Sequence, residues 1–357
     1  MKTITVTTQN AINYGAVLQA YALNNTLRTL GVDDRLLDLS RMQKSFFVKV
    51  RGARNIIYAL YSNLKALRYY KDLKKKYEKF ENFVNKNIVV TDNYKTMEDV
   101  VNNPPSADVY ITGGDQMFNY TSVLRPTNYL EFGDECVRRV SYSTSLGKNE
   151  VMEGHMEDFK QKLQRYEHIS LRESKSKTFV EKIIGKEVNV NIDPSLLLEA
   201  ADWRKIAKKR QRGKYIFCYC LLENEKLQML IDKMKEKTGL PVVVLNPNVN
   251  CFVKADEIIR DAGPEEFLGL IDSADYVIST SFHGVCFSVI FEKPFYCLVK
   301  PNDVRYESLL EMLGLEDRKV ESVETLAEET INYKKVKNII KSEREKSIEY
   351  LKMALGI

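Results

Sequence analysis

Charged side chains follow two apolar, strand-like runs in this sequence of 357 residues. Arg172 ends the run ISLR, and His283 directly follows the run YVISTSF. An arginine at the end of a buried strand is costly unless it meets an anion or a carboxylate. We therefore expect Arg172 either to bind a phosphate or carboxylate of a substrate, or to pair with Glu173 or another buried acid.

His283 stands at the expected start of a helix, beside the hydroxyls of Ser281 and the two residues before it. A helix N-terminus disfavours a protonated imidazole unless an anion lies nearby, and the hydroxyls could contact a phosphate. His283 is therefore either a buried structural histidine or an acid that acts beside a bound anion. Lys300 and Arg305 follow the next strand, where each could hold the same anion or face solvent.

Two polar loops of the first half also follow expected strands. Loop 7–15 could offer its amides to an anion or to sugar hydroxyls, or could cap the helix that follows. Because this loop has a single glycine, it lacks the GxGxxG fingerprint of dinucleotide sites. In the second loop, Gly114 would let the backbone approach a ligand, and Asp115 could orient or deprotonate a hydroxyl or cap a helix.

The charge of the chain is small overall and uneven along its length. There are 54 Lys and Arg against 49 Asp and Glu, a net charge of +5. Segment 44–86 carries +9 and segment 204–214 carries +7, which leaves −11 on the rest. This distribution argues against a nucleic-acid-binding protein. Segment 44–86 is either a solvated helical face or a surface for an anionic membrane or a pyrophosphate-linked substrate.

Several other classes of protein are excluded by composition. The sequence has no run of about 18 apolar residues that could span a bilayer, and its first residues are too polar for a signal peptide. It has three histidines and no CxxC pair, so we expect no metal held by the protein. The chain is expected to be cytoplasmic.

Strand-like runs alternate with helical periodicity along the whole chain, which is typical of α/β proteins. A charged stretch separates two series of strands, and this predicts two Rossmann-like domains, 1–201 and 202–322, followed by a C-terminal helix in 323–357. The periodicity of 45–86 predicts a basic helical insertion in the first domain. The expected strands are 2–7, 35–39, 108–112, 138–143, 169–172, 188–192, 214–221, 241–245, 276–280 and 295–299, and the expected helices are 16–30, 154–166, 173–184, 223–238, 264–272 and 283–292.

Six segments, taken in order, point to a known family. They are INYGAVLQAYAL at 12–23, DVYITGGDQMFN at 108–119, SYSTSLG at 141–147, ISLRE at 169–173, NIDPSLLL at 191–198 and STSFHGVCFSVIFEKPF at 279–295. Together they resemble the polysaccharide pyruvyl transferase family, from about residue 10 to about residue 315. This chain has Gly114 and Phe118 where many relatives have Ser and Trp in GSDQxW.

The resemblance implies transfer of the enolpyruvyl group of phosphoenolpyruvate to two hydroxyls of a sugar, which forms a pyruvate ketal in bacterial surface polysaccharide biosynthesis. It implies two Rossmann-like domains facing a cleft, as in GT-B glycosyltransferases, with the acceptor on the first domain and phosphoenolpyruvate on the second. Phosphoenolpyruvate is a co-substrate, so no cofactor is expected. The acceptor would be a sugar or a lipid-linked oligosaccharide, and 44–86 would make peripheral contact with the inner face of the cytoplasmic membrane.

Two other functions fit the same architecture. One is a glycosyltransferase that uses a sugar nucleotide, and the other is a non-catalytic carbohydrate-binding protein. The first would need a pocket for a nucleobase, and the sequence shows no clear signature of one.

The resemblance places Arg172 and His283 on the donor-binding arginine and histidine of the family, and Arg305 roughly on a basic position after the histidine loop. The other roles are expected from the residues themselves. His283, kept protonated by the bound anion, would act as general acid or stabilise the leaving phosphate, and Asp115 would orient the acceptor hydroxyl. The expected ligands of phosphoenolpyruvate are Arg172, Arg305, Ser281 and Lys300, and the expected acceptor-binding residues are Asn13, Tyr14, Gln19, Gly114 and Gln116.

Overall fold

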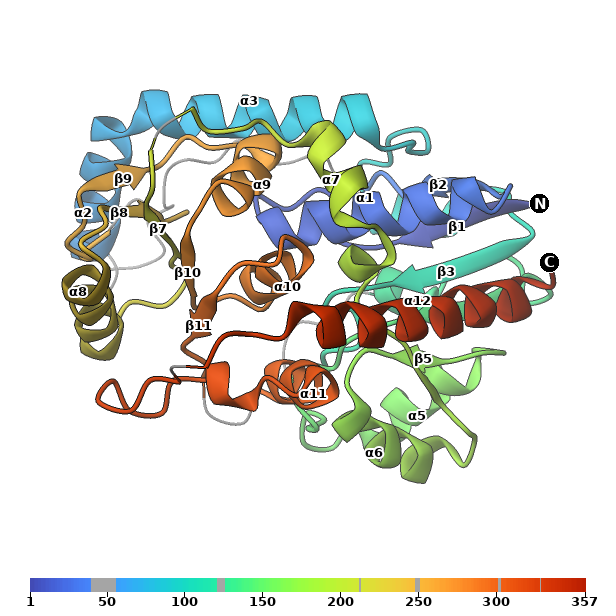
Figure 1. Cartoon of the computed structure of the whole chain (residues 1–357). Coiled ribbons are helices and arrows are strands. Elements are labelled where there is room, and N and C mark those ends of the chain that lie inside the picture. Colours follow the sequence, from blue (N-terminus) through green and yellow to red (C-terminus); the bar gives the residue numbers. More distant parts are fainter. Residues whose placement is uncertain (40–55, 121–125, 212, 248–250, 301–302, 328) are drawn as a thin grey trace.

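Two separate parallel sheets organise the molecule (Figure 1). The structure is a computed structural model and describes residues 1–39, 56–120, 126–211, 213–247, 251–300, 303–327 and 329–357, without the side chains of 56–59 and 65.

The first sheet has the strand order β2-β1-β3-β4, with every pair parallel. A short parallel pair, β5-β6, continues next to β4 through isolated bridges such as Thr144 to Leu171. The strands are β1 (Lys2–Val6), β2 (Asp33–Leu36), β3 (Val109–Gly113), β4 (Arg138–Tyr142), β5 (Ser170–Leu171) and β6 (Asn189–Val190).

The second sheet has the order β11-β10-β7-β8-β9 and is also parallel throughout. All four residues of β7 and all four of β8 are buried, as expected for central strands of a sheet that helices cover on both faces. The strands are β7 (Ile216–Tyr219), β8 (Val242–Leu245), β9 (Glu257–Ile259), β10 (Tyr276–Ser279) and β11 (Phe295–Cys297).

Helices cover both sheets and connect them. They are α1 (Tyr14–Thr29), α2 (Ile56–Arg68), α3 (Tyr70–Asn87), α4 (Met97–Asn102), α5 (Met156–Gln164), α6 (Ser174–Ile184), α7 (Ala200–Ile206), α8 (Glu225–Thr238), α9 (Pro264–Asp272), α10 (Phe282–Ile290), α11 (Val304–Leu313) and α12 (Tyr333–Leu355), with short 3-10 helices η2 (Pro126–Tyr129), η3 (Pro194–Leu197) and η4 (Glu316–Arg318).

The predicted fold class, α/β with two Rossmann-like halves, is confirmed. Each of the ten expected strands is present within a few residues of its predicted bounds, whereas β9 was not expected because it is short and only half-buried. The predicted domain boundary at 201/202 falls inside α7, and the division into domains stays a prediction.

The basic insertion is a link between the halves. Figure 1 shows α3 running across the molecule, and Tyr77 and Phe80 on its inner face are buried. Lys75 lies 2.6 Å from the carboxylate of Asp261, and other lysines of α3 pair with acids of α9. Part of the charge of α3 is therefore used in ion pairs with the second half, and the membrane contact expected of 44–86 stays a prediction. Residues 44–55 of the segment lie outside the described residues.

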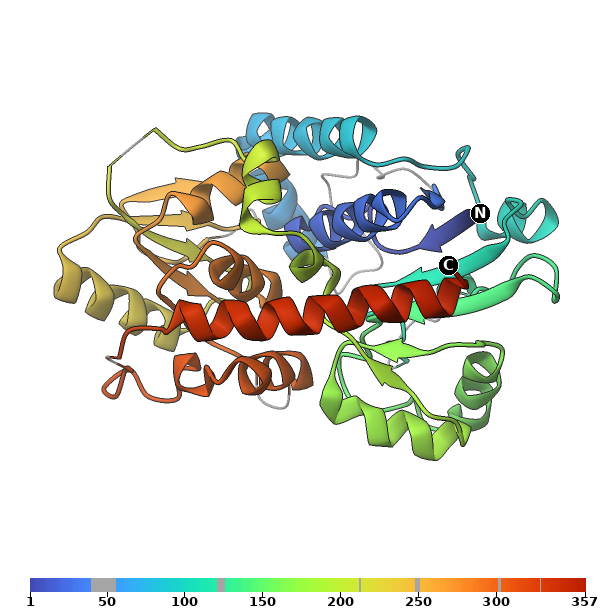
Figure 2. The same ribbon diagram turned by 45° about the vertical axis from the view of Figure 1, so that its right-hand side comes forward.

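The C-terminal helix forms a second link. In both views α12 runs from the second half towards β3 and β4 of the first (Figure 2). Tyr350 donates a hydrogen bond to the carbonyl of Ser141, and Arg344 donates one to the carbonyl of Leu196. The helix begins at Tyr333, later than the sequence indicated.

Candidate functional site

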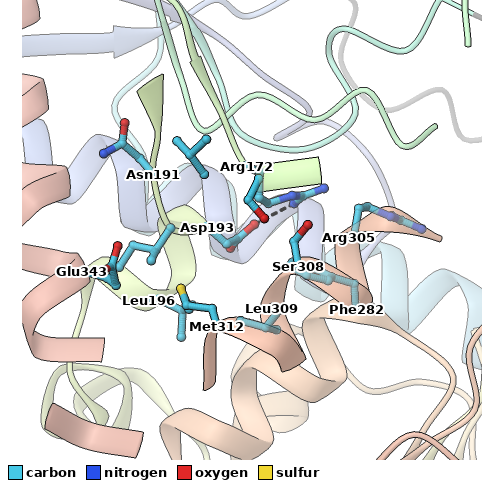
Figure 3. A pocket seen from close by; sticks show the side chains of 13 residues that line it. Arg172, Asn191, Asp193, Leu196, Phe282, Arg305, Ser308, Leu309, Met312 and Glu343 are labelled. Carbon is cyan, nitrogen blue, oxygen red and sulfur yellow. Dashed lines mark hydrogen bonds and ion pairs between the residues drawn. The ribbon is translucent and has the colours of Figure 1, made fainter. Parts of the chain in front are cut away.

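A pocket of about 200 Å³ lies where the two halves meet. Arg172 and Asp193 line it from the first half, and Phe282 and Arg305 line it from the second (Figure 3). The two arginines lie towards one end of the pocket, and Glu343 of α12 lies at the other. The pocket therefore has a cationic end built from both halves.

Arg172 lies directly after β5 and is 7% exposed. Its Nη1 donates to Asp193 Oδ2 at 2.7 Å, its Nε donates to Glu173 Oε1 at 3.3 Å, and the guanidinium lies 4.5 Å from the ring centroid of Phe282. Burial opposes the charge of Arg172, but the carboxylates of Asp193 and Glu173 outweigh it and raise its pKa above the usual value. Nη2 is buried and has no hydrogen-bond partner among the described residues.

Asp193 connects the arginine to the histidine. Its Oδ1 accepts hydrogen bonds from the backbone N–H and the hydroxyl of Ser195, and its Oδ2 lies 3.5 Å from His283 Nε2 as well as beside Arg172. Burial alone would raise the pKa of Asp193, but the charges of His283 and Arg172 and the hydrogen bond from Ser195 hold it well below its usual range. Asp193 is thus a buried carboxylate that contacts both the arginine and the histidine.

His283 is the second residue of α10 and is 7% exposed. Its Nε2 lies 3.5 Å from Asp193 Oδ2, is buried, and forms no hydrogen bond among the described residues. Its ring lies against the first turn of α1, where a Cβ on Gly15 would come within 2.1 Å of Nδ1. Only glycine at position 15 leaves room for the imidazole in this position.

Arg305 lies in the first turn of α11 and forms a two-pronged ion pair with Asp303, with nitrogen–oxygen distances of 2.8 and 2.6 Å. Burial and the nearby charge of Arg172 both lower the pKa of Arg305, but hydrogen bonding to Asp303 leaves it above its usual value. The influence of Arg172 shows that the two guanidiniums share one electrostatic environment. Ser308, on the same helix, has a buried hydroxyl without a partner among the described residues and also lines the pocket.

Asp115 follows β3 with a φ of +40°, a conformation that is uncommon for a residue other than glycine. Its Oδ2 accepts a hydrogen bond from Thr8 Oγ1 at 2.9 Å, and its carbonyl accepts one from the backbone N–H of Ser145. The charge of Asp115 also contributes to the raised pKa of Arg172. Three loops of the first half therefore meet at Asp115, and its charge acts on the arginine.

The amides expected to bind the acceptor lie beside this loop. Gln19 is fully buried and donates to Thr7 Oγ1 at 2.7 Å, while its Oε1 has no hydrogen-bond partner among the described residues. A Cβ on Gly114 would lie 1.8 Å from that oxygen, so the glycine permits the close packing. Gln116 is half-buried and accepts a hydrogen bond from Asn119.

Four other predicted site residues have different surroundings. Tyr14 is 1% exposed, donates to the carbonyl of Ala262 and packs on aromatic rings from both halves, so its expected contact with the acceptor is corrected to a role in the core. Asn13 caps α1 by accepting a hydrogen bond from a backbone N–H. Ser281 is buried and precedes α10 without capping it, and Lys300 is exposed and does not line the pocket.

The sequence reasoning missed Asp193 as a functional residue. The signal was present, because this carboxylate interrupts the apolar run NVNIDPSLLL directly before a proline. An acid inside such a run needs a cationic partner, and Arg172 was available. The contact of Gly15 with His283 had no comparable signal, since the two residues are far apart in sequence.

Neither a metal centre nor a membrane span is found in the part of the chain that the structure describes. Those residues contain no group of three or more His, Cys, Asp or Glu side chains arranged to hold a metal ion. None of the helices in the same residues is long and apolar enough to cross a bilayer.

Several solved structures have a similar fold. They include a UDP-GlcNAc 2-epimerase from Neisseria meningitidis bound to UDP-GlcNAc, at 12% identity over 99% of this chain and 93% of that chain with a TM-score of 0.49. An alpha-glucosyltransferase in complex with UDP and DNA matches at 11% identity over 99% and 95% of the two chains, with a TM-score of 0.48. At such low identity these likenesses carry no argument about function.

Comparison with protein families gives a definite result. A search of curated proteins finds no match, but the family model described as polysaccharide pyruvyl transferase matches residues 13–299. The matched range covers most of the chain and includes Arg172, Asp193 and His283. The chain therefore belongs to the polysaccharide pyruvyl transferase family.

Proposed function

We propose that this protein transfers the enolpyruvyl group of phosphoenolpyruvate to two hydroxyls of one sugar and so forms a pyruvate ketal. The observation that carries the proposal is the buried Nη2 of Arg172, which lacks a partner among the described residues and belongs to a pocket shared with Arg305. Phosphoenolpyruvate carries a phosphate and a carboxylate within a few bonds of each other, and two guanidiniums match such an anion.

The carboxylates around the arginines support this assignment. Asp193 and Glu173 accept hydrogen bonds from two nitrogens of Arg172. Asp303 accepts them from two nitrogens of Arg305, so each guanidinium is held in a fixed orientation. A side chain that is already oriented loses less conformational freedom when the donor binds. The side chain of Ser281 does not cap α10. The backbone N–H groups of the first turn of this helix are therefore suited to bind an anion.

The proposed reaction adds a proton to the methylene carbon of phosphoenolpyruvate, which becomes the methyl group of the ketal. The two sugar oxygens form bonds to the neighbouring carbon, its bond to the phosphate oxygen breaks, and the protons of the two hydroxyls balance the new methyl hydrogen and the released hydrogen phosphate. His283, kept protonated beside Asp193 and the bound anion, would supply the proton or stabilise the leaving phosphate. Asp115 would orient the attacking hydroxyl.

We further propose that the acceptor belongs to the biosynthesis of a bacterial surface polysaccharide, as a soluble or lipid-linked sugar. Support comes from the polar groups on the first-half side of the site, namely Asp115 and the unpartnered Oε1 of Gln19, which could receive sugar hydroxyls. No cofactor is proposed besides the co-substrate. Action at the inner face of the cytoplasmic membrane is part of the same proposal.

The test is mass spectrometry of acceptors after incubation with the protein. Phosphoenolpyruvate or a panel of sugar nucleotides would be combined with soluble and lipid-linked galactosides and mannosides. We expect one acceptor to gain the mass of pyruvate minus water, with release of equimolar phosphate. Addition of a glycosyl group from a sugar nucleotide would instead establish a glycosyltransferase.

A matched pair of variants connects the activity to the site. His283→Asn should abolish product formation while phosphoenolpyruvate still binds. His155→Asn makes the same change at a half-buried histidine before α5, outside the site, and should leave turnover unaltered. Normal turnover by His283→Asn would show that the histidine is not the acid.

A further inference from the structure

The leucines of α2 face away from the protein. Leu60, Leu64 and Leu67 are 57%, 66% and 59% exposed, and Tyr61 beside them is 50% exposed. Residues at positions i, i+4 and i+7 share one side of a helix, so these leucines form a continuous apolar stripe. We call Leu60, Tyr61, Leu64 and Leu67 the α2 stripe. Figure 1 shows α2 at the edge of the molecule, next to one end of α3.

The orientation of α2 is the reverse of that in an ordinary surface helix. Ala66 is 2% exposed, and Ser62 and Asn63 are half-buried, so small and polar residues face the protein. Isolated exposed leucines are common on protein surfaces, but a contiguous apolar stripe marks a site of interaction. Further along the chain, Arg260 lies over the ring of Tyr69 with 4.5 Å to its centroid, a contact that helps to fix the C-terminal end of α2 with the stripe outward.

Two exposed cations lie at the C-terminal end of the α2 stripe. Arg68, at the end of α2, and Lys71, at the start of α3, are both exposed. In the sequence, residues 39–71 contain eight Lys or Arg and no Asp or Glu. Among the described residues, the lysines of α3 that pair with acids of the second half are Lys75, Lys79 and Lys86, so Arg68 and Lys71 are separate from these ion pairs.

Charge decides between two possible occupants of the stripe. A second copy of the chain, docked through the same face, would bring Arg68 and Lys71 of the two copies together, with Asp72 as the neighbouring acid in the first turn of α3. An anionic bilayer offers complementary charge, and leucine and tyrosine on a basic amphipathic helix insert at its interface. We propose that the α2 stripe, flanked by Arg68 and Lys71, docks the protein peripherally on an anionic membrane surface.

This inference sharpens the membrane part of the proposed function by naming the face that meets the lipid. It does not depend on pyruvyl transfer, because binding to vesicles is measured without substrate. Failure of vesicle binding and failure of ketal formation are therefore separate results.

The experiment is co-sedimentation of the full chain with vesicles of phosphatidylcholine alone or mixed with phosphatidylglycerol. We expect binding to the mixed vesicles, with weaker binding as salt screens the charges. The variant Leu60→Ser, Leu64→Ser, Leu67→Ser should bind at least tenfold more weakly, and Arg68→Glu with Lys71→Glu should do the same. Equal binding of the wild type to both vesicle types, or no binding to either, would overturn the proposal.

A control variant removes three exposed apolar side chains elsewhere. Val101, Met229 and Met353 are each about half exposed, on α4, α8 and α12. Their triple replacement by serine should leave vesicle binding unchanged, and loss of binding here would contradict the proposal. Light scattering gives a second readout, since a concentration-dependent dimer abolished by the leucine variant would assign the stripe to a second copy instead. Circular dichroism should show that all variants are folded.

Discussion

At the scale of single residues, Asp193 has a special position because it contacts side chains from both halves. Arg172 comes from the first half and His283 from the second, and both lie against Oδ2 of the same buried carboxylate. Asp193 is a positioning residue in this account, since it holds the donor-binding arginine and the proposed acid at a fixed separation.

Asp193→Asn should lower kcat by roughly 10²-fold, because a misplaced His283 loses general-acid assistance of that order. The KM for phosphoenolpyruvate should rise by less than kcat falls, since Glu173 still contacts Arg172 and Arg305 remains. Arg172→Lys should show the opposite pattern, with a raised KM. Steady-state kinetics on folded protein make the comparison. A kcat unchanged by Asp193→Asn would show that the carboxylate has a structural role only.

Gly15→Ala tests the contact between α1 and the histidine. The added Cβ would lie 2.1 Å from His283 Nδ1, so the ring must move, and turnover should fall at least tenfold. The fold should survive, because alanine has a higher helix propensity than glycine in the first turn of α1. Gly213→Ala is the control, since a Cβ there meets no atom within 4 Å. Equal turnover in the two variants would contradict the proposed placement of the imidazole.

How far the sequence predicts the site depends on the kind of residue. Arg172, His283 and Arg305 were singled out because charged groups at strand ends are unusual. The structure places Arg172 and Arg305 in one pocket and His283 beside Asp193, while their roles stay predictions. Tyr14 was misassigned because an aromatic side chain in a polar loop gives no sign that it packs into the core. Asp193 and Gly15 act through contacts across the fold, which spacing along the chain does not reveal.

At the scale of elements, α3 carries a buried lysine within the link between the halves. Lys76 is 4% exposed, and its Nζ donates to the carbonyl of Pro247 at 2.9 Å. Burial lowers the pKa of Lys76 from 10.5 to about 8. Below pH 8 the folded state therefore keeps a charge that would be better solvated in the unfolded chain.

This shift makes stability depend on pH in a defined direction. Because the unfolded chain binds the proton more tightly, the destabilisation by Lys76 is complete below pH 8 and disappears as the pH rises towards 10.5. Between pH 7 and pH 9.5, the free energy of unfolding of the wild type should rise by about 2 kcal/mol relative to Lys76→Met. Urea unfolding at the two pH values measures the difference. A difference that stays constant would show that the lysine is not buried in its charged form.

Helix periodicity predicts an element well and its orientation poorly. The spacing of apolar residues in 45–86 indicated helices, and α2 and α3 are present. The apolar side defined by this spacing is buried at Phe80 and Val84 of α3 and exposed at Leu60 and Leu64 of α2. The period gives the face that avoids water, but only the tertiary structure shows whether the protein itself covers that face.

At the scale of the whole molecule, two long helices connect the halves. α3 belongs to the first half in sequence and pairs with acids of the second, while α12 follows the second half and bonds to the first. The single tryptophan, Trp203, lies at this junction, fully buried, with its Nε1 donating to the carbonyl of Ser195 and its ring packed against Phe287.

We expect the two halves to unfold together because both links must break before either half separates. In urea, the fluorescence of Trp203 and the far-ultraviolet circular dichroism of the whole chain should follow one coincident transition. A fluorescence change well before the loss of helical signal would show that the junction opens first.

The cationic end of the pocket, with Arg172 and Arg305, is where we propose that phosphoenolpyruvate binds. Isothermal titration calorimetry of the wild type and of Arg172→Gln with phosphoenolpyruvate tests this proposal. The control is Lys182→Gln, which removes the same charge from an exposed lysine on α6. Loss of charge-assisted hydrogen bonds worth about 1.5–3 kcal/mol should weaken binding by one to two orders of magnitude in Arg172→Gln and leave Lys182→Gln unchanged. Equal affinity in all three proteins, or no binding to the wild type, would contradict it.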